Sequence, residues 1–208
     1  MLQTAPLPVR PVGQVLMLHG GAEHGHQPVD GRSLALRRTK AMYDAVAPRL
    51  RDRGVVVSLL RFSVRGWNAT ASPVADTRTA LDTLAERHPG LPVVLVGHSM
   101  GARAAAWAAD HPSVVGVVGL APWFPGDDPV EQLAGLHLVA AHGRRDRITS
   151  ARQTRTYVAR AGEVAASARF VDMGRLGHYM LTGIRRWNEI AVTEALEILD
   201  VGTVTSRD

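Results

Sequence analysis

Short apolar runs alternate with longer amphipathic segments along most of the chain. The runs are nearly continuous in Val, Leu and Ile, which is typical of strands that are covered on both faces. They span Val15–Leu18, Val55–Leu60, Val93–Val96, Val114–Leu120, His137–Ala141 and Ala168–Met173. Between the runs, apolar residues recur at helical spacing. The predicted helices span Thr39–Arg53, Asp76–Arg87, Ala102–Ala109, Ser150–Ala161 and Trp187–Leu199.

Strand and helix alternating in this way predict an α/β fold with right-handed crossovers. We expect a three-layer α/β/α sandwich around six mainly parallel strands. A length of 208 residues fits one domain over residues 1–208. Within it, residues 1–13 are interpreted as an N-terminal extension and residues 201–208 as a flexible tail.

Residues that can do chemistry follow the predicted strands repeatedly. In open parallel sheets the site lies beyond the carboxyl ends of the strands, so these segments are expected to converge on one edge. They begin His19-Gly20-Gly21-Ala22, Arg61 to Trp67, Gly97-His98-Ser99-Met100-Gly101, Ala121-Pro122-Trp123-Phe124, His142-Gly143-Arg144-Arg145-Asp146 and Gly174 to His178.

Ser99 stands between two glycines where a Val-rich strand gives way to an Ala-rich helix. A Gly-x-Ser-x-Gly sequence in that position makes a sharp turn that holds the serine hydroxyl clear of the backbone. Gly97 and Gly101 are expected to be needed because a side chain there would collide with neighbouring elements. The helix that follows directs its N-terminal N–H groups at the site and favours developing negative charge.

With this turn the chain resembles the α/β-hydrolase family over roughly Gln14 to Leu199. The resemblance implies an acid after a later strand and a histidine after the last strand, in the order Ser, Asp, His. Asp146 in His-Gly-Arg-Arg-Asp and His178 in Gly-His-Tyr-Met occupy those places. In this interpretation His178 takes the serine proton and Asp146 fixes the imidazole.

The resemblance also implies an oxyanion hole. One donor would be the backbone N–H of Met100, the residue after the nucleophile, and the other that of Gly21 or Ala22 after the first strand. Small residues in that loop let the backbone approach a substrate closely.

Several other residues compete for roles at the same edge. Asp127 and Asp128 are rival acids, although the spacing in His-Gly-x-x-Asp favours Asp146. His19 and His142 are interpreted as structural, and His98 as packing near the strand end. The loose set Glu23, His24, His26 and Asp30 does not make a convincing metal site, and no metal or other cofactor is expected.

Aromatic side chains are the candidates for a substrate pocket. Trp67, Trp123, Phe124 and Tyr179 either line the pocket or close the top of the core. Arg61 and Arg65 are interpreted mainly as structural, with a positive rim for an anionic substrate as the alternative.

The connection Ala121–Leu136 is too short for the lid domain that many members of the family carry. It is expected to hold a loop and one short helix near Pro129–Ala134. An open site without a lid favours hydrolysis over acyl transfer. The long loop Gly21–Arg38 is the one segment predicted to be able to fold over the site.

Composition narrows the classes of function further. The chain has no cysteine, which excludes a cysteine nucleophile, and no segment that reads as a transmembrane span or secretory signal, so a cytoplasmic location is expected. Its net charge of +5 comes from scattered arginines, which does not favour nucleic-acid binding.

The function expected from the sequence is therefore that of a serine hydrolase. Its substrate would be a small carboxylic ester or related acyl compound, cleaved through an acyl-enzyme. Thioesterase, peptidase or lyase activity on the same residues and a non-catalytic binding protein remain alternatives, and the oligomeric state stays open.

Overall fold

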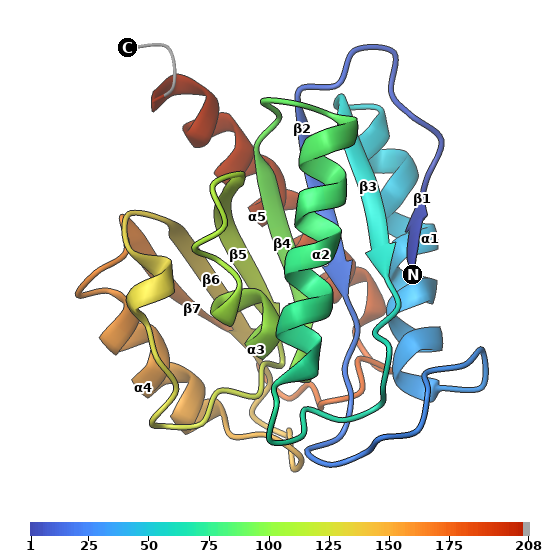
Figure 1. The fold of residues 1–208 in the computed structure, drawn as a ribbon. Helices are drawn as coiled ribbons and strands as arrows, with labels where there is room; N and C mark the ends of the chain where they lie inside the picture. The colour runs from blue at the N-terminus through green and yellow to red at the C-terminus, as the bar shows by residue number, and fades with distance from the viewer. Residues whose placement is uncertain (206–208) are drawn as a thin grey trace.

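The computed structural model describes residues 1–205, and its centre is one sheet of seven strands (Figure 1). The strands are β1 (Leu2–Thr4), β2 (Gly13–Leu18), β3 (Val55–Leu60), β4 (Val93–His98), β5 (Val114–Leu120), β6 (His137–His142) and β7 (Ser167–Asp172). Their order in the sheet is β1-β3-β2-β4-β5-β6-β7, and every neighbouring pair is parallel except β1 with β3. The predicted α/β class is confirmed.

The prediction of six strands was wrong by one. Residues interpreted as an extension form β1, which pairs with β3 so that Leu2 lies opposite Leu60. The two hydroxyls of Thr4 and Ser58 are 2.9 Å apart across this pair. Three residues are too few for an alternating pattern to be recognised, so the ladder to β3 reveals this strand where periodicity could not.

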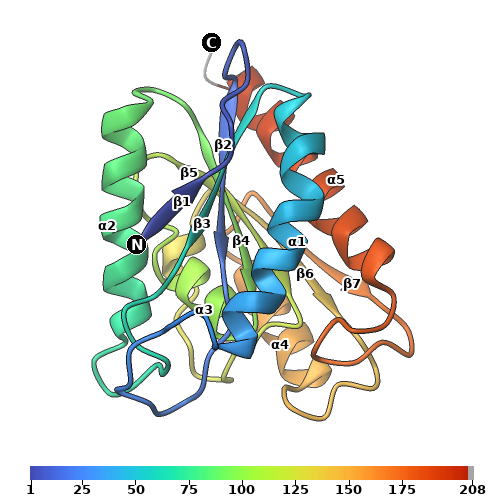
Figure 2. The same cartoon turned by 90° about the vertical axis from the view of Figure 1, so that its right-hand side faces the viewer.

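Helices cover both faces of the sheet, as Figure 2 shows from the side. They are α1 (Leu34–Arg51), α2 (Ser72–Arg87), α3 (Met100–Trp107), α4 (Ala151–Ala161) and α5 (Ile184–Thr205). Helices α1 and α5 pack together on one face, and α2 and α3 on the other. The core lies between these layers, where β2, β3 and β4 are buried along their whole length.

The connection between β5 and β6 carries no lid. It contains a single short 3₁₀ helix, η1 (Glu131–Leu133), close to the predicted one. The sheet edge at the carboxyl ends of the strands is therefore left without an inserted domain in the described chain.

The loop after β2 is bonded to the loop after β3. It is also shorter than the predicted loop Gly21–Arg38. Helix α1 begins at Leu34, where the Ser33 hydroxyl accepts the Leu36 N–H. The segment before it pairs with the loop after β3 through isolated bridges, Ala22 with Gly66 and Pro28 with Val64. The loop is thus bonded to a neighbouring loop along its length.

The last helix extends into the segment predicted to be a flexible tail. Helix α5 continues to Thr205, and residues 206–208 lie outside the described part of the chain. Within residues 1–205, none of the helices combines the length and apolar character that crossing a membrane requires.

Candidate active site

Ser99 lies in a strained turn between β4 and α3. Its backbone has φ 53° and ψ −116°, a conformation that residues with a side chain rarely adopt. A Cβ on Gly97 would lie 2.4 Å from the Ala102 nitrogen, and one on Gly101 would lie 2.4 Å from the Leu18 oxygen. The two glycines are therefore sterically required, as the sequence predicted.

Backbone bonds hold this turn against the loop after β5. The Ser99 N–H donates to the Leu120 oxygen at 3.1 Å, and the Trp123 N–H donates to the Ser99 oxygen at 3.2 Å. The Ser99 side chain is nearly buried, and its hydroxyl makes no hydrogen bond within the described chain. The hydroxyl is therefore not hydrogen-bonded to His178 in this structure.

Asp146 and His178 come together although the chain separates them by a helix and a strand. Asp146 follows β6 and His178 follows β7. The distance from His178 Nδ1 to Asp146 Oδ2 is 2.7 Å, and both side chains are almost completely buried. With a carboxylate at this distance, Nδ1 carries the proton and Nε2 is left to accept one.

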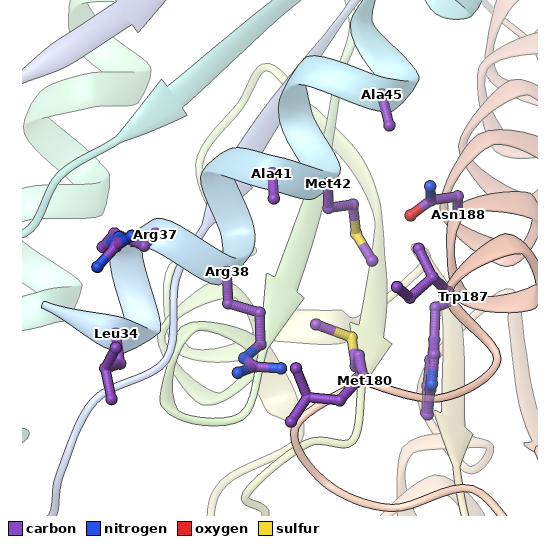
Figure 3. A pocket seen from close by; sticks show the side chains of 11 residues that line it. Leu34, Arg37, Arg38, Ala41, Met42, Ala45, Met180, Trp187 and Asn188 are labelled. Atoms are coloured by element: carbon purple, nitrogen blue, oxygen red, sulfur yellow. The ribbon is translucent and has the colours of Figure 1, made fainter.

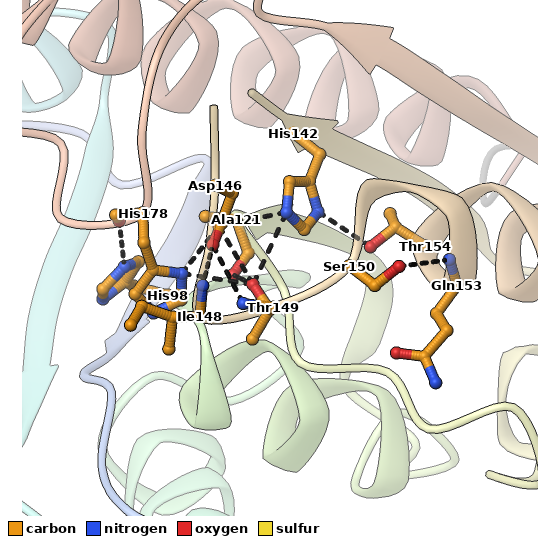
Figure 4. Close-up of polar contacts among 10 residues, drawn as sticks. All are labelled: His98, Ala121, His142, Asp146, Ile148, Thr149, Ser150, Gln153, Thr154 and His178. Atoms are coloured by element: carbon orange, nitrogen blue, oxygen red, sulfur yellow. Dashed lines mark hydrogen bonds and ion pairs between the residues drawn. The ribbon is translucent and has the colours of Figure 1, made fainter. Parts of the chain in front are cut away.

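The Asp146 carboxylate is bonded on both oxygens (Figure 4). Oδ1 accepts the N–H groups of Ile148 and Thr149 at 2.8 and 2.9 Å, and Oδ2 lies 3.0 Å from the Thr149 hydroxyl. Burial raises the pKa of Asp146, but hydrogen bonds from His142, His178 and the two backbone N–H groups outweigh it and hold the pKa well below its ordinary value. Asp146 is ionised at neutral pH.

His142 is a site residue whose contact with Asp146 the sequence did not indicate. Its Nε2 lies 3.0 Å from Asp146 Oδ2, and its Nδ1 lies 2.8 Å from the Thr154 hydroxyl. The side chain is completely buried. A neutral ring satisfies both contacts if Nε2–H donates to the carboxylate and Nδ1 accepts from Thr154. The signal that the sequence offers is its position at the end of β6, four residues before Asp146.

Two further buried histidines support the loops around the site. His98 Nε2 lies 3.0 Å from the His178 carbonyl oxygen, and their rings are 5.0 Å apart. His19 Nδ1 donates to the Gly20 oxygen at 2.6 Å while Nε2 accepts the Phe62 N–H at 3.1 Å. Burial lowers the pKa of His19 to about 4 and that of His98 to about 3, so both are neutral. The structural role predicted for His19 matches these contacts.

The candidate oxyanion donors differ in availability. Met100 is the first residue of α3, where a helix leaves its N–H without an intrahelical acceptor. Gly21 lies against it, since a Cβ on Gly21 would be 2.4 Å from Met100 Cε. The Ala22 N–H already donates to the Arg65 oxygen at 2.9 Å. Of the two loop residues named from the sequence, Gly21 is therefore the one that we pair with Met100 in the proposal below.

The predicted aromatic residues divide between the site and the core. Phe124 is buried and stacks on Tyr157 with ring centroids 4.2 Å apart, so it closes the core and does not line a pocket. Trp67 is also buried, with its ring edge-on to that of Trp123. Trp123 is partly exposed and is joined to Ser99 through its N–H, so it remains a candidate pocket wall.

The rival acid Asp128 has a different partner. Its carboxylate accepts two bonds from the Arg103 guanidinium, at 2.7 and 2.6 Å, and is almost fully buried. That guanidinium in turn lies over the Trp67 and Trp123 rings, 4.1 and 4.4 Å from their centroids. Asp128 therefore neutralises a buried arginine, whereas Asp146 contacts the histidine.

Tyr179 is more than half exposed beside His178, with ring centroids 5.4 Å apart and edge-on. A cavity of about 260 Å³ lies against these two residues and is lined also by Arg145, Ile148 and Leu181. Tyr179, one of the predicted pocket residues, thus lines an open cavity beside His178.

Three of the four polar loop residues considered as metal ligands have partners within the protein. Glu23 and His24 are exposed and 3.9 Å apart, and Asp30 accepts the Arg65 guanidinium at 3.2 Å. Throughout residues 1–205, no three side chains from His, Cys, Asp and Glu are grouped as metal binding requires. Arg65 also donates to the Pro28 oxygen, which fits its structural interpretation.

Comparison with known proteins places this geometry among hydrolases. A family model described as "Serine aminopeptidase, S33" matches residues 9–140, which include Ser99 but neither Asp146 nor His178. No curated protein sequence matches.

Several solved structures share the fold. The serine hydrolase without a lid XC6422 from Xanthomonas campestris is 16% identical, with a TM-score of 0.64 over 91% of this chain and 86% of that one. The butyrate-bound esterase Est2 from Thermogutta terrifontis is 15% identical, with a TM-score of 0.72 over 95% and 88%. The monoacylglycerol lipase from Paleococcus ferrophilus is 14% identical, with a TM-score of 0.68 over 95% and 99%.

Proposed function

We propose that this chain, which belongs to the serine aminopeptidase S33 family of α/β-hydrolases, cleaves carboxylic esters through an acyl-enzyme on Ser99. In this mechanism Ser99 is the nucleophile, His178 the general base and then acid, and Asp146 the residue that orients His178. The backbone N–H groups of Met100 and Gly21 form the oxyanion hole.

Each step follows from the protonation states at the site. As the Ser99 oxygen bonds to the ester carbonyl, its proton passes to His178 Nε2, and the ionised Asp146 stabilises the resulting imidazolium. The N–H groups of Met100 and Gly21 stabilise the oxyanion. The imidazolium then protonates the departing alkoxide, and a water activated by the neutral ring hydrolyses the acyl-enzyme by the same steps.

The observation that carries the proposal is the 2.7 Å bond between Asp146 and His178 at the sheet edge where Ser99 is held in its strained turn. The ring of His98, the residue before Ser99, lies 5.0 Å from the His178 ring, which supports a common site. We favour an ester over a peptide as substrate because two of the similar folds are an esterase and a monoacylglycerol lipase.

Labelling with a fluorophosphonate probe tests the nucleophile. The wild-type protein should be labelled and should hydrolyse p-nitrophenyl acetate, and Ser99→Ala should lose both. Ser167→Ala, a change at an exposed serine on β7, is the matched control and should retain both. If folded wild-type protein is not labelled, or if Ser99→Ala is labelled as strongly as the wild type, the proposal is wrong.

Ester chemistry is tested separately from the nucleophile. Esters, thioesters and aminoacyl amides of the same acyl group should differ in kcat/KM, with the ester cleaved fastest. A protein that is labelled at Ser99 but prefers the amide would keep the mechanism and change the substrate class.

A further inference from the structure

A groove of about 360 Å³ lies between helices α1 and α5, outside the residues that carry out the proposed steps (Figure 3). This volume falls within the range of small-ligand pockets. Its walls come from one face of α1, from the segment after His178 and from the first turns of α5. The residues that line it are Leu34, Arg37, Arg38, Ala41, Met42, Ala45, Met180, Leu181, Ile184, Trp187 and Asn188.

Several of the apolar side chains that line the groove are exposed to solvent. Leu34 is 72% exposed, Leu181 68% and Ile184 55%. Three large aliphatic side chains around one groove form a contiguous apolar surface of the kind that marks a binding site. Met42 and Trp187 form its buried floor.

Positive charge lies at the end of this groove that is nearer to the site. Within the described chain, neither Arg37 nor Arg38 is within salt-bridge distance of a carboxylate, and Lys40 beside them takes Asp44. At the other end of the same two helices, Arg49 of α1 pairs with Glu189 of α5 at 3.0 Å. The two unpaired guanidinium groups are available to an anionic ligand.

Ring contacts connect the groove to the candidate active site. The Arg38 guanidinium lies 5.4 Å from the centre of the Tyr179 ring, and that ring lies 5.4 Å from the His178 ring. Met180 and Leu181 line both this groove and the cavity beside His178. A ligand held in the groove would therefore have its charged end a short distance from the reacting ester.

We infer that this groove binds the apolar chain of an anionic amphiphilic substrate, with Arg37 and Arg38 binding its carboxylate or phosphate. The inference rests on the proposed esterase function and specifies its substrate class. The apolar part lies along Ala41, Met42 and Trp187, and the ester lies at Ser99. Uncharged short esters fill only the site itself.

The test measures binding without turnover, in Ser99→Ala protein, by calorimetry with decanoate, decyl phosphate, decanol and decyltrimethylammonium. Both anions should bind more tightly than decanol, and the cation should bind least. Affinity should rise about fourfold for each added methylene between hexanoate and decanoate, until the groove is full. Equal affinity for anion and cation, or binding only above the micelle-forming concentration, would overturn the inference.

Variants localise the binding. Ala41→Glu places a carboxylate within reach of Arg38 and should weaken decanoate binding at least tenfold, and Arg38→Gln should remove the preference for anions over decanol. Ala75→Glu, at an exposed position of α2 on the opposite face, and Arg53→Gln, beyond the far end of α1, are the matched controls. If the controls weaken binding as much as the groove variants, the groove is not the site.

The two hypotheses fail in different ways. Loss of probe labelling and of p-nitrophenyl acetate hydrolysis in wild-type protein contradicts the proposed function. Normal hydrolysis of the acetate with no binding of decanoate to Ser99→Ala contradicts the groove alone.

Discussion

Among single residues, His142 contacts the proposed catalytic acid, Asp146, but has no step of its own in the proposed reaction. It donates to the same carboxylate oxygen of Asp146 that accepts from His178. His142 and His178 therefore contact the same oxygen from two sides, at 3.0 and 2.7 Å. We regard His142 as a positioning residue that tunes and orients Asp146.

Replacing His142 by leucine removes a hydrogen bond to a buried charge, worth about 1–3 kcal/mol. We expect kcat to fall by about one to two orders of magnitude. The pKa of Asp146 is held well below its ordinary value partly by this bond, so its loss raises that pKa, while KM should stay close to the wild-type value because the completely buried ring of His142 cannot contact a substrate.

His142→Gln is the matched variant, because its amide can donate from a similar position, and it should recover part of the rate. If His142→Gln recovers none of the rate, or if His142→Leu changes KM as much as kcat, the residue is only structural.

The sequence allowed Ser99, Asp146 and His178 to be named because each stands in a recognisable short pattern after a strand. It could not show the His142 contact, since the direction of a buried ring depends on how β6 and the following loop pack. It could not choose between Gly21 and Ala22 either. The bond from the Ala22 N–H to the oxygen of Arg65, which lies far along the chain, is what favours Gly21 in the proposal.

Among elements, α3 is attached to the loop after β5 by the buried ion pair of Arg103 and Asp128. Asp128→Asn leaves the arginine charge without its partner. We expect a loss of about 3 kcal/mol in the free energy of unfolding, because breaking one partner of a buried pair is strongly destabilising. Urea unfolding measures it.

Asp127→Asn is the control for this prediction, since Asp127 is exposed and should change stability by less than about 0.5 kcal/mol. Asp128→Asn should also keep fluorophosphonate labelling of its folded fraction. Complete loss of labelling in stable, folded Asp128→Asn protein would instead make Asp128 the acid.

The strands could be predicted from the sequence because a run of Val and Leu residues bounded by turn residues is typical of a buried strand. The start of α1 was placed five residues late because Thr39, which is polar, occupies a buried position of the helix and interrupts the apolar spacing. Strand β1 was missed because it is held by its ladder to β3, which a local pattern does not contain.

For the whole molecule, buried neutral histidines should make stability depend on pH. The pKa of His19 is lowered to about 4 and that of His98 to about 3, against an ordinary value near 6.5. Between pH 6.5 and about 4 the unfolded chain binds protons at these residues and the folded chain does not. Stability should therefore fall with decreasing pH, by about 1.4 kcal/mol per pH unit for each histidine.

Urea unfolding at pH 7.5 and pH 5 checks this expectation. His19→Gln should be less stable at both values but should show a smaller difference between them. The surface variant His26→Gln is the control. If His19→Gln keeps the full pH difference, other groups account for it.

The left-handed backbone of Ser99 has a consequence for how this protein can be stabilised. Glycine tolerates such a conformation, whereas a residue with a Cβ stores about 1–3 kcal/mol there. Ser99→Gly should therefore melt at a higher temperature than the wild type while being chemically inert. Selection for heat resistance alone would then favour loss of the proposed nucleophile, so variants selected for stability also need to be assayed for ester hydrolysis.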